Sequence, residues 1–236
     1  MKKRPFACRA LPAVVCTLLA FAVFFSSCSW LHRVTFTGNV YQDTKTGLTY
    51  RALSNAYEPV SRGDAYATVR IGDISHTLYR ITDLEPGAFL SSAYNDVYCR
   101  EDLSVPELAD WAPSTVYVCT TTNVVVAELT LRRENADQGE VIDQLVRAYA
   151  EEEAVSYPTW ADASVNRTLR FASERIPGLY YCLRYYEFTE DIYTVRTDEA
   201  GNREEVNLGR YFLYNRFESR CVPVDDTLHR LLEENE

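Results

Sequence analysis

Alternation of apolar and polar residues dominates the chain from residue 34 onward and predicts β-strands. The clearest examples cover residues 65–71, 115–121 and 124–132, and each is bounded by turn-forming residues. The alternation returns over residues 166–224, where the segment 198–202 has the composition of a tight turn. We therefore expect antiparallel strands in both halves of the chain.

One segment in the middle of the chain has helical periodicity instead. Asp137 and Glu140 have the spacing of a capping box, in which two side chains satisfy free backbone amides at the start of a helix. The helix should end near residues 151–153, because three glutamates there oppose the negative end of the helix dipole. Its apolar stripe consists of Val141, Ile142, Leu145, Ala148 and Tyr149.

The order of these elements predicts an α+β fold: antiparallel β-sheets covered by one long helix and a short C-terminal helix. The short helix should begin at Asp225 or Asp226. The apolar stripe, with Leu145 at its centre, should pack against a sheet containing the strand that begins at Leu179. Residues 34–236 would form this domain, with a possible subdomain boundary near residue 133.

The first 27 residues have a different pattern. Three basic residues at positions 2–4 precede an apolar run over residues 11–25, and two serines then precede Cys28. This order is typical of a secretory signal. The apolar run is shorter than the roughly 20 residues that a membrane-spanning helix needs.

The segment from Phe25 to Cys28 resembles the lipobox of bacterial lipoproteins, in which an apolar residue and two small residues precede a cysteine. Phe25 departs from the commonest form, which has Leu at that position. The resemblance implies a signal peptide over residues 1–27, acylation of Cys28 (for example with palmitate) and a short tether over residues 28–33. The alternatives are an uncleaved anchor helix with an incidental thiol at Cys28, or a soluble product. The leading interpretations place the domain outside the cytoplasm, in the cell envelope.

Removal of this segment would make the protein more acidic. The whole chain has 24 Lys and Arg against 34 Asp and Glu, a net charge of −10. Residues 1–27 contain four of the cations and no acid, so residues 28–236 carry 20 cations against 34 acids, a net charge of −14. Such a surface repels phosphate backbones and anionic head groups. Nucleic acid is therefore not expected as a partner, and the lipid would provide the membrane attachment.

The sequence contains no recognisable catalytic or metal-binding motif. The three histidines, His32, His76 and His229, are isolated from one another, and no nucleophile elbow, phosphate loop or zinc-ligand spacing occurs. The glutamates of residues 151–153 point in different directions on a helix, so they do not converge on a substrate. We therefore expect no enzyme activity, no cofactor and no metal.

Four tyrosines are the candidate ligand-binding residues. On a single strand, Tyr180 and Tyr186 share one face, whereas Tyr181 and Tyr185 share the other. If a helix covers one face, the other displays tyrosines that can stack on sugar rings or on a peptide. The competing interpretation is that these side chains only stabilise the sheet.

Four cysteines remain in the predicted mature domain: Cys99, Cys119, Cys182 and Cys221. An even number in an exported chain is typical of a disulfide framework. A long hairpin centred between residues 201 and 202 would place Cys182 opposite Cys221 and leave Cys99 with Cys119. Two alternatives stay open: a turn at residues 215–219 would send Cys221 back along its own strand, and all four cysteines could be buried free thiols.

These patterns together predict a lipid-anchored extracytoplasmic protein with a non-enzymatic role in binding or envelope assembly and an unknown protein or glycan partner. The alternative is a lipoprotein that binds carbohydrate or peptide through a tyrosine-bearing sheet face. A hydrolase ranks third, because no nucleophile lies beside a base in the sequence.

Overall fold

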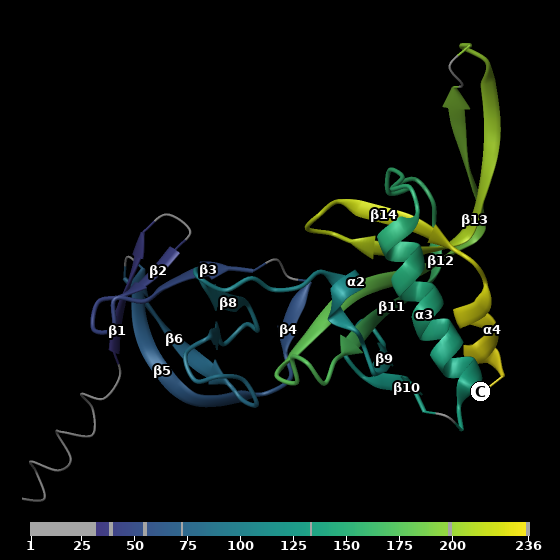
Figure 1. Cartoon of the computed structure of the whole chain (residues 1–236). Helices are drawn as coiled ribbons and strands as arrows, with labels where there is room; N and C mark the ends of the chain where they lie inside the picture. Colours follow the sequence, from purple (N-terminus) through teal and green to yellow (C-terminus); the bar gives the residue numbers. More distant parts are fainter. Residues whose placement is uncertain are drawn as a thin grey trace, which may run out of the picture.

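The computed structural model describes residues 32–37, 40–53, 56–71, 73–132, 134–197 and 200–234. Residues 1–27 and Cys28, which carry the signal-peptide and acylation predictions, lie outside these ranges. The described chain forms two lobes that lie side by side in Figure 1. The N-terminal lobe is a closed β-barrel, and the C-terminal lobe is a larger sheet with three helices.

Seven strands close the N-terminal barrel in the order β1-β2-β3-β8-β7-β6-β5. Neighbouring strands are antiparallel, except that β1 and β5 pair in parallel and so complete the ring. Closure leaves the sheet without a free edge. The strands are β1 (His32–Thr37), β2 (Val40–Asp43), β3 (Thr49–Ala52), β5 (Arg62–Ile71), β6 (Ile74–Ile81), β7 (Phe89–Ser91) and β8 (Val97–Arg100).

Tyrosines and aliphatic residues fill the barrel, together with one buried carboxylate. Asp43 is fully buried, and the Tyr66 hydroxyl donates a hydrogen bond of 2.5 Å to its Oδ2 atom. The Tyr50 hydroxyl donates to the carbonyl oxygen of Gly87 at 2.9 Å. Burial, and then the hydrogen bond to Asp43, raise the pKa of Tyr66. The carboxylate is therefore part of the barrel's internal structure.

The C-terminal lobe is a seven-stranded sheet. Six strands follow the order β10-β9-β11-β12-β13-β14, and β4 pairs with the beginning of β12. The strands are β4 (Tyr57–Pro59), β9 (Thr115–Cys119), β10 (Val125–Thr130), β11 (Ala163–Ala172), β12 (Leu179–Thr197), β13 (Arg203–Asn215) and β14 (Arg220–Val224). Because β4 comes between barrel strands in the sequence, its pairing with β12 joins the two lobes.

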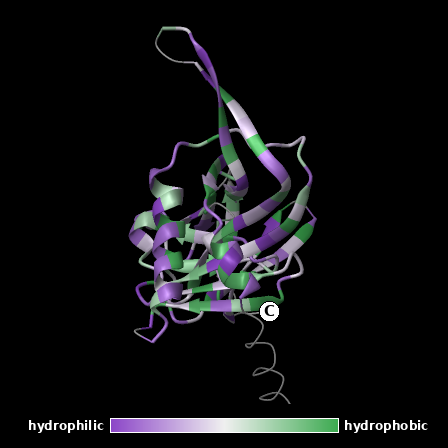
Figure 2. Ribbon diagram, turned by 90° about the vertical axis from the view of Figure 1, so that its right-hand side faces the viewer, coloured by the Kyte–Doolittle hydropathy of each residue, from purple (hydrophilic) through white to green (hydrophobic). Residues whose placement is uncertain are grey.

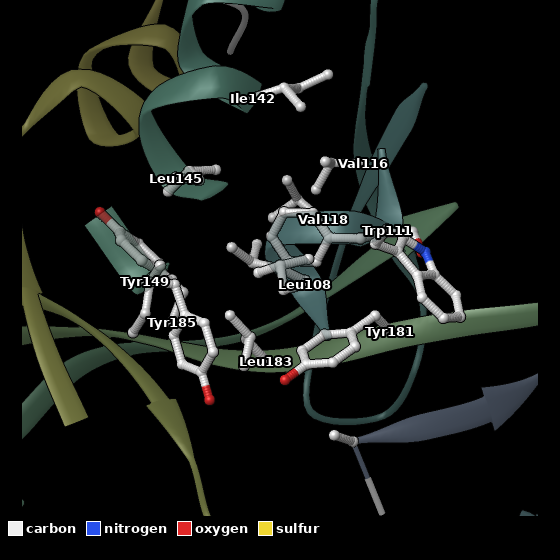
Figure 3. Close-up of a cluster of buried hydrophobic side chains, with 14 of the residues drawn as sticks. Leu108, Trp111, Val116, Val118, Ile142, Leu145, Tyr149, Tyr181, Leu183 and Tyr185 are labelled. Carbon is white, nitrogen blue, oxygen red and sulfur yellow. The ribbon is translucent and has the colours of Figure 1, made fainter. Parts of the chain in front are cut away.

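Three helices cover one face of this sheet: α2 (Leu108–Trp111), α3 (Ala136–Glu151) and α4 (Thr227–Glu233). Four of the five residues of the predicted stripe are buried in α3, Ala148 being only partly buried, and Leu145 is only 4% exposed. They share a core with Tyr181, Leu183 and Tyr185 of β12 (Figure 3). This confirms the predicted packing of the helix on the strand that begins at Leu179. The helix also ends at Glu151, as the run of glutamates predicted.

The α+β class predicted from the sequence is wrong. The described part of the chain is mostly β, with 51% strand and 14% helix, and its three helices are short. The prediction required one long helix to cover the antiparallel sheets. Instead, the first sheet buries its apolar face by closing on itself, and α3 covers only the second sheet. Alternation shows that one face of a strand is buried, but it does not show which element buries that face.

Strands β12 and β13 continue beyond their neighbours as a two-stranded arm, defined here as residues 189–210. β11 pairs with β12 only as far as Phe188, and β14 pairs with β13 only from Tyr211 onward. Register shifts near Ile192 and a positive φ of 75° at Gly209 mark the base of the arm. Figures 1 and 2 show the arm projecting away from the body of the molecule.

Candidate functional site

Strand β12 places its four candidate tyrosines on opposite faces, as the alternation predicted. Tyr181 and Tyr185 are fully buried on the face that the helices cover (Figure 3). Tyr180 and Tyr186 are half-buried on the other face, which we call the open face. Within the described part of the chain, no helix contributes to the lining of the open face. Tyr181 and Tyr185 therefore support the core and cannot reach a ligand on the open face.

A groove of about 430 Å³ lies on the open face. Tyr186 lines it, whereas Tyr180 lies farther along the face, packed against Tyr117 and Arg170. The groove is lined by Ala56, Glu58, Thr121, Asn166, Thr168, Cys182, Leu183, Arg184, Tyr186, Tyr214, Asn215, Arg216 and Phe217.

Strand pairing aligns the floor of the groove. Thr168 of β11 lies opposite Arg184 of β12, and Arg184 lies opposite Tyr214 of β13. Paired residues in antiparallel strands point to the same face, so these three side chains form a row across the sheet. Arg184 Nη1 donates a 2.7 Å hydrogen bond to Thr168 Oγ1. This bond holds the guanidinium in the floor, and its other N–H groups have no partner among the described residues.

A second row of paired residues contributes an unused acceptor. Asn166 lies opposite Tyr186, one step along the same face. The Oδ1 atom of Asn166 is buried and accepts no hydrogen bond from the described residues. A buried acceptor without a donor costs free energy.

Three tyrosines form a packed wall at one end of the groove. The ring of Tyr157 stacks on Tyr214 with centroids 4.6 Å apart and lies 5.3 Å from the ring of Tyr186. Burial raises the pKa of Tyr157 to about 12, so this side chain stays neutral at physiological pH. The wall therefore holds Tyr186 and Tyr214 in fixed positions, whereas Phe217 at the rim is 49% exposed.

The groove has an excess of positive charge in an acidic protein. Glu58 is the one acid among its lining residues, and Arg170 binds its Oε2 atom through Nε at 2.9 Å and Nη2 at 2.7 Å. By contrast, neither Arg184 nor Arg216 forms an ion pair with a described residue. Because Glu58 is neutralised by its own arginine, these two guanidinium groups dominate the charge of the groove.

The tight turn between β13 and β14 supplies the rim residues Arg216 and Phe217. The Asn215 side chain shapes this turn, because its Oδ1 atom accepts hydrogen bonds from the backbone amides of Phe217 at 3.0 Å and Glu218 at 3.4 Å. Sequence reasoning missed both rim residues. The signal was the Asn at the start of an interruption between two strand-like segments.

The same turn explains why the predicted disulfide between Cys182 and Cys221 is absent. Cys221 lies on β14 opposite Tyr214, whereas Cys182 lies on β12, so β13 separates the two strands. Strands lie about 4.8 Å apart, so two steps exceed the limit of about 7 Å between the Cα atoms of a disulfide. The second predicted pair is also absent: Cys99, Cys119, Cys182 and Cys221 are all buried free thiols.

A histidine and two carboxylates meet beneath α4, away from the groove. His229 Nδ1 lies 3.1 Å from Glu187 Oε1, and its Nε2 lies 3.2 Å from Glu233 Oε1. The His229 ring also stacks on Tyr211 with centroids 5.2 Å apart. These contacts attach the C-terminal helix to the sheet and account for this cluster without a ligand.

A larger cavity, of about 510 Å³, lies between α3, β14 and α4. Its lining contains no aromatic ring, and its charged residues are Arg147, Glu151, Glu152 and Asp225. Its apolar lining includes the core residues Val141, Leu145 and Leu228 of the two helices. The groove on the open face is the better candidate, because it combines fixed aromatic rings with two guanidinium groups that form no ion pair with a described residue.

Among the described residues, no group of three or more His, Cys, Asp and Glu side chains could hold a metal ion. No helix in the same part of the chain has the length and apolar character needed to cross a membrane. Comparison of the sequence with protein-family models, with curated proteins and with solved structures found no match in any of the three.

Proposed function

We propose that this chain is an extracytoplasmic lipoprotein that acts by binding a ligand. In this proposal the signal peptide directs export, acylated Cys28 anchors the protein to the membrane, and the C-terminal lobe carries the binding site. The basic and apolar N-terminal segment and the lipobox-like sequence before Cys28 support the anchored location.

The proposed ligand is a carbohydrate or a peptide, and the groove on the open face is the proposed site. The observation that carries this proposal is the ordered row of side chains on the groove floor, next to a fixed aromatic wall. Binding sites typically combine apolar or aromatic surface with a few fixed polar groups, as this groove does. The lining contains no nucleophile paired with a base, which supports binding over catalysis.

Arrays of oligosaccharides and of peptides, probed with the full chain in detergent, test this proposal. Phe217→Ala should weaken binding to any ligand that the array reveals, because Phe217 is an exposed ring at the rim of the groove. Tyr94→Ala is the matched control, because Tyr94 is an exposed ring outside the groove lining. Equal loss in both variants, or no ligand in either array, contradicts the proposal.

A second candidate role, protein contact during envelope assembly, is favoured by the arm. A hollow of about 380 Å³ separates the arm from the loop after α3, and exposed apolar side chains surround it. Trp160, Tyr193 and Val195 are each at least half exposed there. A photo-crosslinker at residue 193 should then capture a specific envelope protein that the same crosslinker at residue 94 does not capture.

A further inference from the structure

The guanidinium groups of Arg184 and Arg216 give the groove a chemical preference beyond its shape. Arg184 uses one N–H group on Thr168, and Arg216 projects from an exposed turn. Carboxylates are natural ligands for such groups, because the planar guanidinium fork matches the two carboxylate oxygens. The acidic surface elsewhere repels anions, so a local pair of arginines without an ion pair to any described residue is needed to hold one.

The position of the groove favours a sugar chain over a peptide. Extended peptides commonly bind by adding a strand to a free sheet edge, where backbone amides and carbonyls are unused. At the groove, however, β12 pairs with β11 on one side and β13 on the other. A ligand on this face therefore meets side chains only. Sugar rings suit such a surface, because their apolar faces pack on aromatic rings and their hydroxyls bond to polar side chains.

An exposed ring adds a surface that suits a sugar. The ring of Phe217 at the rim of the groove is 49% exposed and is free to pack on a sugar face. We propose that the groove binds an acidic glycan, with the carboxylate of a sugar held by Arg184 and Arg216. This inference rests on the proposed function, which it narrows to one ligand class.

Pairs of charged and neutral sugars test the charge preference directly. The probes are oligomers of galacturonate, hyaluronan and sialic acid, each compared with its own methyl ester, which keeps the ring but removes the charge. Calorimetric titration of the full chain in detergent should show binding at least tenfold tighter for the best acid than for its ester. Raising the NaCl concentration should weaken binding of the acid and leave that of the ester nearly unchanged.

Substitution of the arginines locates the effect in the groove. Arg216→Gln and Arg184→Gln should each weaken binding of the acid by about tenfold or more and change binding of the ester little. Arg216 is the more direct test, because it is exposed on a turn and its loss should not disturb folding. Arg175→Gln is the matched control, since Arg175 is exposed on the opposite end of the β11–β12 hairpin.

The outcomes separate this inference from the proposed function. Equal binding of acid and ester, both weakened by Phe217→Ala, overturns the charge preference and leaves the binding role in place. Tighter binding of hexaglutamate than of any acidic glycan overturns the glycan class in favour of an acidic peptide. Failure of all three acids to bind overturns the inference, and if the arrays also yield no ligand, the proposed function fails with it.

Discussion

Burial of the four thiols has a consequence for alkaline stability. Burial raises the pKa of Cys221 to about 12 from its ordinary value of 9.0. The unfolded chain therefore loses this proton at a lower pH than the folded chain does. The raised pKa of Cys221 therefore adds to the free energy of unfolding. This added stability is fully present below pH 9 and is lost as the pH rises toward 12, by up to about 1.4 kcal/mol per pH unit.

Cys221→Ala should reduce this dependence. Urea unfolding at pH values from 8 to 10.5 should show a smaller fall in stability for the variant than for the unchanged chain. The slope is the relevant quantity, because the substitution also leaves a small cavity that lowers stability at every pH. Identical slopes, or a peptide map under non-reducing conditions that links Cys182 to Cys221, would contradict the assignment of free thiols.

Leu145 tests the packing of α3 on the sheet of the C-terminal lobe. Its side chain packs between α3 and β12 and is 4% exposed. Leu145→Ala should lower the free energy of unfolding by about 2–5 kcal/mol. The smaller side chain leaves a cavity between α3 and β12, and the surrounding side chains can fill it only in part. Ile74→Ala serves as the comparison, since Ile74 is 63% exposed and should change stability little. Equal effects in denaturant titrations would refute the placement of α3.

At the scale of elements, local sequence patterns predicted which face of a helix or strand is buried. They did not predict which other element packs or pairs with it. The stripe on α3 and the two faces of β12 followed from periodicity, because periodicity is set within the element. Barrel closure depends on β1 meeting β5, and no local pattern encodes that contact. The predicted register was wrong because two shifts at the base of the arm and the turn after Asn215 bring Tyr186 opposite Phe212.

For the candidate site too, the sequence predicted which face a side chain occupies but not which side chains lie beside it. Alternation indicated that Tyr186 would lie on an exposed face if a helix covered the other. It could not show that Thr168 and Tyr214 would flank Arg184, because that row requires the register of three strands. The rim residues Arg216 and Phe217 depend in addition on the turn that Asn215 shapes.

The arm should be dispensable for folding. Tyr193 and Asn207 are paired across it, so residues 194–206 can be replaced by an Asn-Gly turn without changing the register below. The shortened chain should keep its free energy of unfolding within about 1 kcal/mol of the original, because the removed strands form a ladder only with each other and the ion pair that joins them to the body, Arg196 with Glu153, is exposed. Loss of cooperative unfolding, or loss of groove binding, would show that the arm has a structural role.

At the scale of the whole molecule, Gly178 lies where the two lobes touch. A Cβ atom at this position would lie 2.4 Å from the carbonyl oxygen of Thr82 and 2.5 Å from Leu84 Cγ, both in the barrel lobe. The Gly178 carbonyl also accepts a hydrogen bond from Val60 at 2.9 Å. The close approach of the lobes therefore requires a residue without a side chain.

Gly178→Ala should separate the lobes locally and cost about 1–3 kcal/mol. Gly139→Ala is the control, because its added Cβ meets only the end of the flexible Leu131 side chain and alanine favours the helix. Thermal unfolding measures the loss of stability, and limited proteolysis between β8 and α2 measures the local separation of the lobes. An unchanged melting temperature for Gly178→Ala would mean that the lobes do not rely on this contact.

Acylation of Cys28 remains a prediction from the sequence, and it concerns the whole molecule because it decides where the protein lies. Cys28→Ala should release the protein from the membrane or leave an uncleaved precursor. Metabolic labelling with a palmitate analogue should mark the unchanged chain and not the variant. Absence of label on the unchanged chain would contradict the lipoprotein assignment.

The pairing of β4 with β12 also has a consequence for the order in which the lobes fold. Tyr57 lies opposite Tyr181, and the intervening chain includes most of the barrel and the whole of α3. Because a chain emerges from its N-terminus, during synthesis or during the proposed export, the barrel strands can pair with one another before β12 is available. Until β12 emerges, Tyr57 of β4 has no partner strand to cover it. We therefore expect the β4–β12 pair to join the two lobes after the barrel strands have paired.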